Sequence, residues 1–188
     1  MKYYSLNLEG ITRQLPFVDI NDEIAYASFV VISDIELISK VAPILAEKIG
    51  DCDVIVTAEA KGITLAHEVS KCLNLNRFVV ARKSIKSYMK NPISVPVKSI
   101  TTTTVQNLYL DENDLKYLNN KNVCLLDDVV STGDSLNALN KLVEKANGKV
   151  IKKACILAEG DAAKKDDLIF LQRLPLFKKI NGEYEEIL

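Results

Sequence analysis

VCLLDDVVSTGDSL, the stretch from Val123 to Leu136, runs from an apolar strand into two adjacent carboxylates and then through a short loop into a helix. Small hydroxyl residues and a glycine at a helix N-terminus expose backbone N–H groups at the positive end of the helix dipole, which favours an anion such as a phosphate monoester. The carboxylates of Asp127 and Asp128 can accept hydrogen bonds from the two adjacent hydroxyls of a ribose held by that phosphate. The stretch therefore predicts a cradle for ribose 5-phosphate.

A plainer interpretation treats the loop as an N-cap turn and the two aspartates as a solvated strand end. That interpretation accounts for either half alone, but the whole string is a long pattern that is rarely met by chance. The chain contains neither G-x-x-x-x-G-K-[ST] nor G-x-G-x-x-G. Nucleoside-triphosphatase and dinucleotide-binding functions therefore lack their own signal.

A second loop with similar chemistry lies at TAEAKGI, Thr57 to Ile63, where another strand ends and a helix begins. Gly62 permits a tight backbone approach, and Lys61 supplies positive charge. A strand, a turn and a helix with a lysine and a glycine are common, so this loop alone is a weak signal. Beside the first loop, it predicts a second anion site.

Together these stretches resemble the type I phosphoribosyltransferases. Val123 to Leu136 is similar to their motif for phosphoribosyl pyrophosphate (PRPP), and Thr57 to Ile63 is similar to the pyrophosphate loop of the purine enzymes. Ala81 to Ser84 resembles the basic start of their mobile catalytic loop. Over residues 33–160 the similarity is closest to adenine and xanthine phosphoribosyltransferases and to the PRPP-binding domain of the purine-operon repressor.

The resemblance implies a set of PRPP contacts and a Mg²⁺ ion bound with PRPP. The implied contacts are Glu59, Ala60, Lys61, Gly62, Arg82, Lys83, Asp127, Asp128, Val129, Val130, Ser131, Thr132, Gly133, Asp134 and Ser135. Among these, the residues implied to be catalytic are Asp127, Asp128, Lys61, Arg82 and Lys83. Adenine enzymes carry a glutamate in the mobile loop, but residues 84–110 contain no Asp or Glu, so proton transfer by that route is absent here.

The expected fold is a single α/β domain, because strand-length apolar stretches alternate with helical patterns along 188 residues. The resemblance implies a mostly parallel five-stranded sheet flanked by helices, with a core at about 33–160. It also implies a small hood over the base, built here from residues 1–32 and 165–188, and assembly as a homodimer.

Local patterns predict the following elements. A capping box at Ser33 and Glu36 opens a helix to about residue 49, which Pro43 is expected to kink or split. Extended pieces are expected at 3–8, 15–20 and 27–32, strands at 53–57, 78–81, 122–126 and 150–158, and helices at 63–73 and 136–146. Residues 82–104 form a long polar connection, interpreted as a functional loop. Asn181-Gly182 predicts a terminal hairpin.

The predicted activity is transfer of the phosphoribosyl group to a purine, in purine salvage, and the preferred base is adenine. Glu159 follows the strand at 150–158, where hypoxanthine-guanine enzymes carry a lysine for the 6-oxygen, and a carboxylate accepts from a 6-amino group. Glu159 as a plain exposed strand end, and xanthine as the base, stay open. So does a PRPP-sensing regulator without activity, although no added N-terminal DNA-binding domain is evident. An orotate or uracil enzyme is disfavoured by the purine-like loops.

Composition points to a cytoplasmic protein with small-molecule partners. The chain is 48% hydrophobic with a formal net charge of -1, which argues against disorder and against the basic field that nucleic-acid binding uses. Neither a membrane-spanning apolar run nor the apolar core of a signal peptide is present. We therefore expect no nucleic-acid and no membrane partner.

Overall fold

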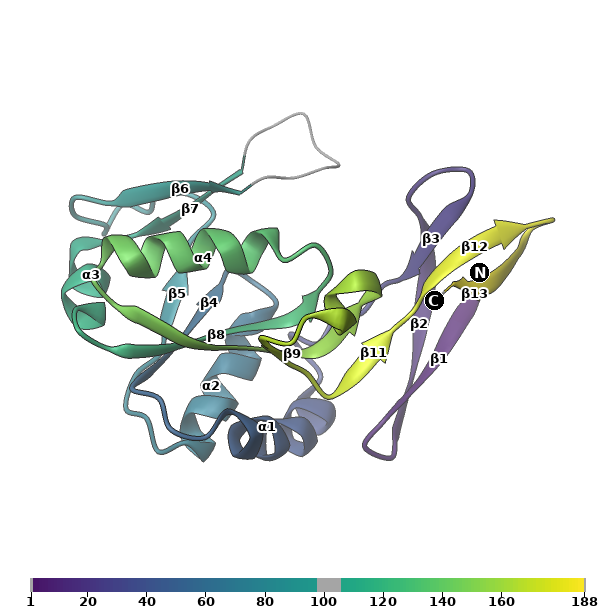
Figure 1. Ribbon diagram of the computed structural model, residues 1–188, viewed down its shortest axis with the longest axis horizontal. Helices are drawn as coiled ribbons and strands as arrows, with labels where there is room; N and C mark the ends of the chain where they lie inside the picture. The colour runs from purple at the N-terminus through teal and green to yellow at the C-terminus, as the bar shows by residue number, and fades with distance from the viewer. Residues whose placement is uncertain (1, 98–105, 188) are drawn as a thin grey trace.

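The computed structural model describes residues 2–97 and 106–187 (Figure 1). Its centre is a parallel sheet in which five strands follow one another in the order β10-β9-β8-β4-β5, with β11 also paired to β9. Their bounds are Val54–Ala58 (β4), Val79–Ala81 (β5), Asn122–Val130 (β8), Lys149–Glu159 (β9), Leu168–Ile169 (β10) and Gln172–Leu174 (β11). The predicted α/β class and mostly parallel sheet are confirmed; β11 makes it a sheet of six strands where five were expected.

Helices cover both faces of this sheet, which explains why its inner strands are continuous apolar runs. On one face α1 (Ile35–Ile49) and α2 (Gly62–Cys72) pack against one apolar cluster. On the other face α4 (Asp134–Lys145) packs into a second cluster, together with α3 (Glu112–Leu118) and the hairpin of β6 (Ile93–Val97) and β7 (Gln106–Leu110). Figure 1 shows α4 and the hairpin on the side opposite α1 and α2.

The start of α1 differs from the predicted capping box. Asp34, not Ser33, is the N-cap, and its carboxylate accepts the N–H of Leu37 at 3.1 Å. Pro43 lies inside one continuous helix, so the expected split is wrong. Pro43 is exposed, and so is Ser39, the residue whose carbonyl loses its helical partner; water can satisfy that carbonyl.

The two ends of the chain meet in a second, antiparallel sheet, here called the hood sheet, with the order β1-β2-β3-β12-β13. Its strands are Tyr3–Leu8 (β1), Ile11–Asp19 (β2), Ile24–Ala27 (β3), Leu176–Ile180 (β12) and Glu183–Ile187 (β13). The predicted hairpin at Asn181-Gly182 is confirmed, with both residues at positive φ. The third expected strand is displaced, since β3 ends at Ala27, where the prediction began.

The hood sheet joins the core through buried apolar side chains. Leu6, Leu8, Leu15 and Phe177 share one cluster with the buried face of α1. Figure 1 shows the hood sheet standing at one end of the central sheet, with both chain termini in it.

The polar connection predicted at 82–104 is partly wrong, because residues 93–97 form β6 and pair with β7. Residues 98–104 of that connection lie outside the described residues. A short 3-10 helix, η1 (Gly160–Lys164), follows β9. None of the helices within residues 2–97 and 106–187 is long and apolar enough to cross a membrane.

Candidate functional site

The predicted site residues come together where β4, β8 and β9 end, on the side of the core that faces the hood sheet. A cavity of about 210 Å³ lies there. Its lining combines residues at or just after the ends of β4, β8, β9 and β11 with residues from the hood side. These are Lys61, Val129, Ser131, Glu159 and Leu174, and Tyr26, Ala27, Ser28 and Phe29. Parallel strands bring their carboxyl ends to one edge, which is where open α/β sheets bind ligands.

Asp127 and Asp128 form the acidic centre of this site. The N–H of Asp128 donates to Oδ1 of Asp127 at 2.9 Å. The Asp128 side chain is only 5% exposed, and its Oδ2 has no hydrogen-bond partner within the described residues. Burial, and then the neighbouring charge of Asp128, raise the pKa of Asp127 to about 7. The pair therefore offers a buried acceptor that is ready for a hydroxyl donor.

The phosphate loop, here residues 131–135, connects β8 to α4. Gly133 is the N-cap of α4 and adopts φ 87° and ψ 7°, a left-handed conformation that glycine tolerates best. The sequence predicted that Asp134 and Ser135 lie in the loop before the helix. In the structure α4 begins at Asp134, so both residues belong to its first turn. The Thr132 hydroxyl donates to the Asp134 carboxylate at 2.6 Å and ties the two together.

Lys165, which sequence reasoning missed, lies against this loop. Its Nζ donates to the carbonyl of Thr132 at 2.9 Å. The same Nζ would lie 2.7 Å from a Cβ built on Gly133. A lysine at the N-terminal end of a helix opposes the helix dipole unless an anion is bound there. The adjacent Lys164 instead pairs with Asp161 at 2.7 Å on the surface.

The second loop, which links β4 to α2, leaves no space for a side chain at Gly62. A Cβ there would lie 2.3 Å from Oγ1 of Thr57 and 3.4 Å from Oδ1 of Asp127. The peptide between Glu59 and Ala60 is cis. Gly62 is the first residue of α2. Because a Cβ at Gly62 would touch Asp127, the start of this helix packs directly against the acidic pair.

Glu59 organises the basic residues that follow β5. Its carboxylate accepts the N–H of Lys83 at 2.8 Å and lies 3.3 Å from Nη2 of Arg82 and 3.7 Å from Nζ of Lys86. The hydrogen bond from Lys83 is the main reason that the pKa of Glu59 is lowered. Arg82 also exchanges two backbone hydrogen bonds with Tyr109, at 2.9 and 2.8 Å. Lys86 was missed because it lies beyond the quoted motif.

Lys61 points toward the acidic centre and the hood side of the cavity. Its Nζ lies 3.7 Å from Oδ2 of Asp128 and donates to the carbonyl of Phe29 at 3.4 Å. Glu159 lines the same cavity, half-buried; burial raises the pKa of Glu159, and the nearby charge of Lys61 opposes that rise. The sequence did not predict the contact between Lys61 and Phe29, nor that residues 26–29 form a wall of the cavity. No local pattern links residues 26–29 to the loops after β4 and β8.

Val129, Val130 and Ala60, which were predicted to contact PRPP, differ in how exposed they are. Val129 lines the cavity. Val130 is 4% exposed and belongs to the apolar cluster under α4, so its side chain is part of the core. Ala60 is exposed in its loop.

Known proteins share this architecture. The family model of the phosphoribosyl transferase domain matches residues 32–184. An adenine phosphoribosyltransferase structure from Thermoanaerobacter pseudethanolicus superposes with a TM-score of 0.66 over 85% of this chain and 95% of that one, at 20% identity. The fold is therefore that of the type I phosphoribosyltransferases. The chain belongs to the phosphoribosyltransferase domain family.

Curated relatives carry different functions. A hypoxanthine/guanine phosphoribosyltransferase of Methanococcus voltae is 35% identical over 113 residues, which is 60% of this chain and 56% of the relative. The purine biosynthesis transcriptional repressor PurR of Bacillus subtilis is 27% identical over 135 residues, 69% of this chain and 46% of the repressor. The chain thus spans about half the length of these relatives.

Proposed function

We propose that this protein is a purine phosphoribosyltransferase that transfers the phosphoribosyl group of PRPP to a purine nitrogen and releases pyrophosphate. The observation that carries the proposal is the cavity between the hood side and the strand ends, lined by Lys61, Ser131 and Glu159. Nζ of Lys61 links it to the acidic pair, 3.7 Å from Oδ2 of Asp128. A ribose 5-phosphate held at the strand ends would place its reactive carbon toward that cavity, where a base can enter. The family membership and the adenine phosphoribosyltransferase fold support the same conclusion.

In this proposal the phosphate loop binds the 5-phosphate through its backbone N–H groups, and Lys165 adds a positive charge beside it. Asp127 and Asp128 accept hydrogen bonds from the ribose hydroxyls. Oδ2 of Asp128 is free to do so, because it has no hydrogen-bond partner within the described residues and only the ammonium of Lys61 near it, at 3.7 Å. Val129 and Val130 contribute backbone at the end of β8.

The pyrophosphate binds at the second loop. Backbone of residues 59–62 and the basic residues that Glu59 gathers, Arg82, Lys83 and Lys86, surround it. Lys61 belongs to the same loop, but its contact with Asp128 directs it to the ribose side of the pyrophosphate. These cations stabilise the negative charge that develops on the leaving group.

Mg²⁺ is proposed to bind with PRPP. The ion would be held mainly by the substrate's own oxygens, as Mg²⁺ usually is at phosphate sites. Asp128 is the protein group suited to it, since its buried Oδ2 accepts no hydrogen bond within the described residues. The ion would neutralise charge on the departing pyrophosphate. The protein contributes positioning and electrostatics, with no protein nucleophile.

For the base we propose adenine. Glu159 lines the cavity, and an ionised carboxylate accepts a hydrogen bond from a 6-amino group but repels a 6-oxygen. Its raised pKa brings the protonated form closer to neutral pH, and a protonated Glu159 would donate to a 6-oxygen. Hypoxanthine, guanine and xanthine are therefore the competing bases, and the Methanococcus voltae relative is a hypoxanthine/guanine enzyme by name.

The second candidate is a PRPP-sensing regulator, which the similarity to PurR favours. Initial rates with PRPP, Mg²⁺ and a panel of adenine, hypoxanthine, guanine, xanthine and pyrimidines distinguish the two. We expect turnover with one purine above all, and adenine first. PRPP binding without turnover on any base would establish the regulator, whereas xanthine outrunning adenine would change only the base. A cytoplasmic homodimer, with a core at about 33–160 and a hood from 1–32 and 165–188, completes the proposal.

A further inference from the structure

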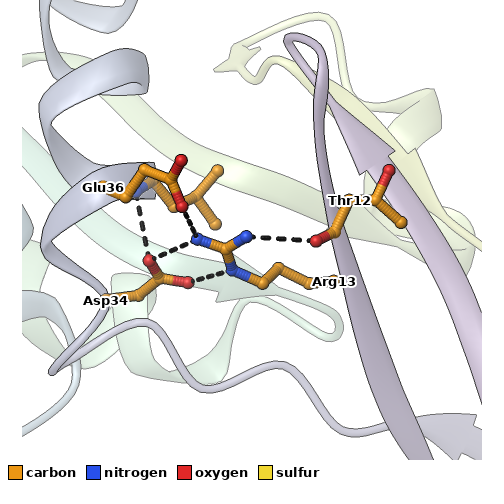
Figure 2. A network of polar contacts seen from close by, with 5 residues as sticks. Thr12, Arg13, Asp34 and Glu36 are labelled. Carbon is orange, nitrogen blue, oxygen red and sulfur yellow. Dashed lines mark hydrogen bonds and ion pairs between the residues drawn. The ribbon is translucent and has the colours of Figure 1, made fainter.

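Arg13 connects the hood sheet to the core by a forked ionic contact, shown in Figure 2. Arg13 lies in β2, and Asp34 is the N-cap of α1. Nε of Arg13 donates to Oδ2 of Asp34 at 2.6 Å, and Nη2 donates to Oδ1 of Asp34 at 2.9 Å and to Oε2 of Glu36 at 2.7 Å. Nη1 donates to the Thr12 carbonyl at 3.1 Å, which steadies the guanidinium within its own strand.

The contact is partly shielded from water and rigid. The Arg13 and Asp34 side chains are 30% and 20% exposed. Two parallel N–H···O bonds to one carboxylate fix orientation as well as distance, which a lysine could not do. Asp34 has no freedom to follow a moving arginine, because its Oδ1 also accepts the N–H of Leu37 in the first turn of α1.

Asp34 ends the segment that forms the hood-side wall of the cavity. Residues 28–34 connect β3 to α1, and Ser28 and Phe29 at their start line the cavity. The hood sheet holds the first residue, since the Ser28 N–H donates to the Pro16 carbonyl at 2.9 Å. The core holds the middle, where the Thr64 hydroxyl donates to the Ile32 carbonyl at 3.0 Å. Arg13 joins the hood sheet to the last residue.

We propose that Arg13 is a positioning residue that sets the wall of the base cavity relative to the phosphoribosyl loops. This inference rests on the proposed function. The ribose and phosphate contacts all come from the core, at β8, α4 and the loops after β4 and β5. Tyr26 to Phe29 lie on the hood side. Loss of the fork therefore weakens contacts to the base and leaves contacts to ribose 5-phosphate intact.

The test compares two ligands that differ only by the base. Calorimetry gives the Kd of ribose 5-phosphate and of the purine nucleoside 5-monophosphates AMP, IMP, GMP and XMP for the wild type and for Arg13→Met. We expect Arg13→Met to weaken the best nucleotide about tenfold, since small displacements of a binding wall have effects of this order. The Kd of ribose 5-phosphate should stay within about twofold. Arg13→Lys, which keeps the charge without the fork, should fall between.

The matched control is Lys179→Met. It removes an ion pair between Lys179 and Asp19, at 2.5 Å, that lies wholly inside the hood sheet, so both affinities should be unchanged. If Arg13→Met does not fold, Asp34→Asn replaces it, because asparagine keeps the N-cap and removes the charge that Arg13 grips.

The outcomes separate the inference from the proposed function. Equal nucleotide affinity in a folded fork variant and the wild type overturns the positioning role, as does an equal loss for nucleotide and ribose 5-phosphate. A wild-type protein that binds neither ligand overturns the proposed function itself, and the positioning role with it.

Discussion

Gly62→Ala tests the packing between the second loop and the acidic pair most directly. The added Cβ would lie 2.3 Å from Oγ1 of Thr57, far inside van der Waals contact, and Thr57 is fully buried, so its side chain cannot swing into solvent. Something must therefore shift: the loop, Thr57 or β4. The next nearest atom is Oδ1 of Asp127 at 3.4 Å, so a shift of the loop reaches the ribose site.

The size of the effect follows from two opposing contributions. Overpacking a well-filled interior costs about 1–3 kcal/mol. Replacing glycine with alanine gains up to about 1 kcal/mol, because the unfolded chain loses freedom. We expect the free energy of unfolding to fall by about 1–2 kcal/mol, a drop in Tm of about 2–8 °C for a domain of this size. Denaturant melts measure it, and calorimetry should show weaker binding of pyrophosphate.

Thr57→Ala should rescue Gly62→Ala, since it removes the clashing oxygen. The Thr57 hydroxyl has no hydrogen-bond partner within the described residues, so its removal alone should change stability by less than about 1 kcal/mol. Thr57→Val is the matched control: it also lacks the hydroxyl but keeps the shape, and should not rescue. A Gly62→Ala variant as stable as the wild type, or equal rescue by valine, would refute the steric reasoning.

Three further predictions concern charge. Lys165→Met should weaken the binding of ribose 5-phosphate about tenfold, as expected for one exposed charge-assisted contact, and leave the binding of pyrophosphate unchanged. The control Lys164→Met should change neither affinity. Equal effects of the two variants would remove Lys165 from the site. Asp127→Asn with Asp128→Asn should weaken PRPP well over tenfold, by about 1.5–3 kcal/mol per contact, in a protein that stays folded by circular dichroism. The pKa of Asp127 in the folded protein is about 7, above its ordinary value of 3.8. Between these two pH values the native state therefore binds more protons than the unfolded state. The contribution of Asp127 to stability should fall as pH rises from about 4 to about 7. Urea melts across that pH range should show that the free energy of unfolding declines less steeply in the single variant Asp127→Asn than in the wild type. An unchanged slope would contradict a buried Asp127 that keeps its proton in the folded protein.

The parallel core could be predicted from sequence because its signals are local. Val54–Ala58 and Asn122–Val130 are apolar runs that end in loops with Gly and small polar residues, and each of these features has one dominant structural meaning. The hood sheet shows the opposite case. Its hairpin was readable from Asn181-Gly182, but the pairing of β3 with β12 joins residues 24–26 to 176–178. No local pattern specifies a contact over that separation.

The candidate site divides in the same way. Asp127, Asp128 and the phosphate loop were found because strand, carboxylates and helix start are contiguous in sequence. The proposed roles of Lys165, Lys86 and Arg13 rest instead on contacts between distant residues. Lys165 contacts the carbonyl of Thr132, Lys86 contacts Glu59, and Arg13 contacts Asp34. Lysines and arginines are too frequent on surfaces for any one of them to stand out before the fold brings its partner close.

This division also explains why the base is the part of the function that sequence and fold similarity leave open. In the proposed function the loops that hold PRPP serve whichever base is used, so similarity in those loops does not identify the base. Hypoxanthine/guanine and adenine phosphoribosyltransferases both resemble the chain in sequence, at 35% and 32% identity, and an adenine phosphoribosyltransferase also resembles it in fold. We propose that the base instead meets Glu159 and the wall from Tyr26 to Phe29, which line the cavity. That wall precedes residue 32, where the family match begins. In this proposal, discrimination between purines depends on the hood sheet and on the contacts that hold it, so variants there should change base preference without changing PRPP affinity.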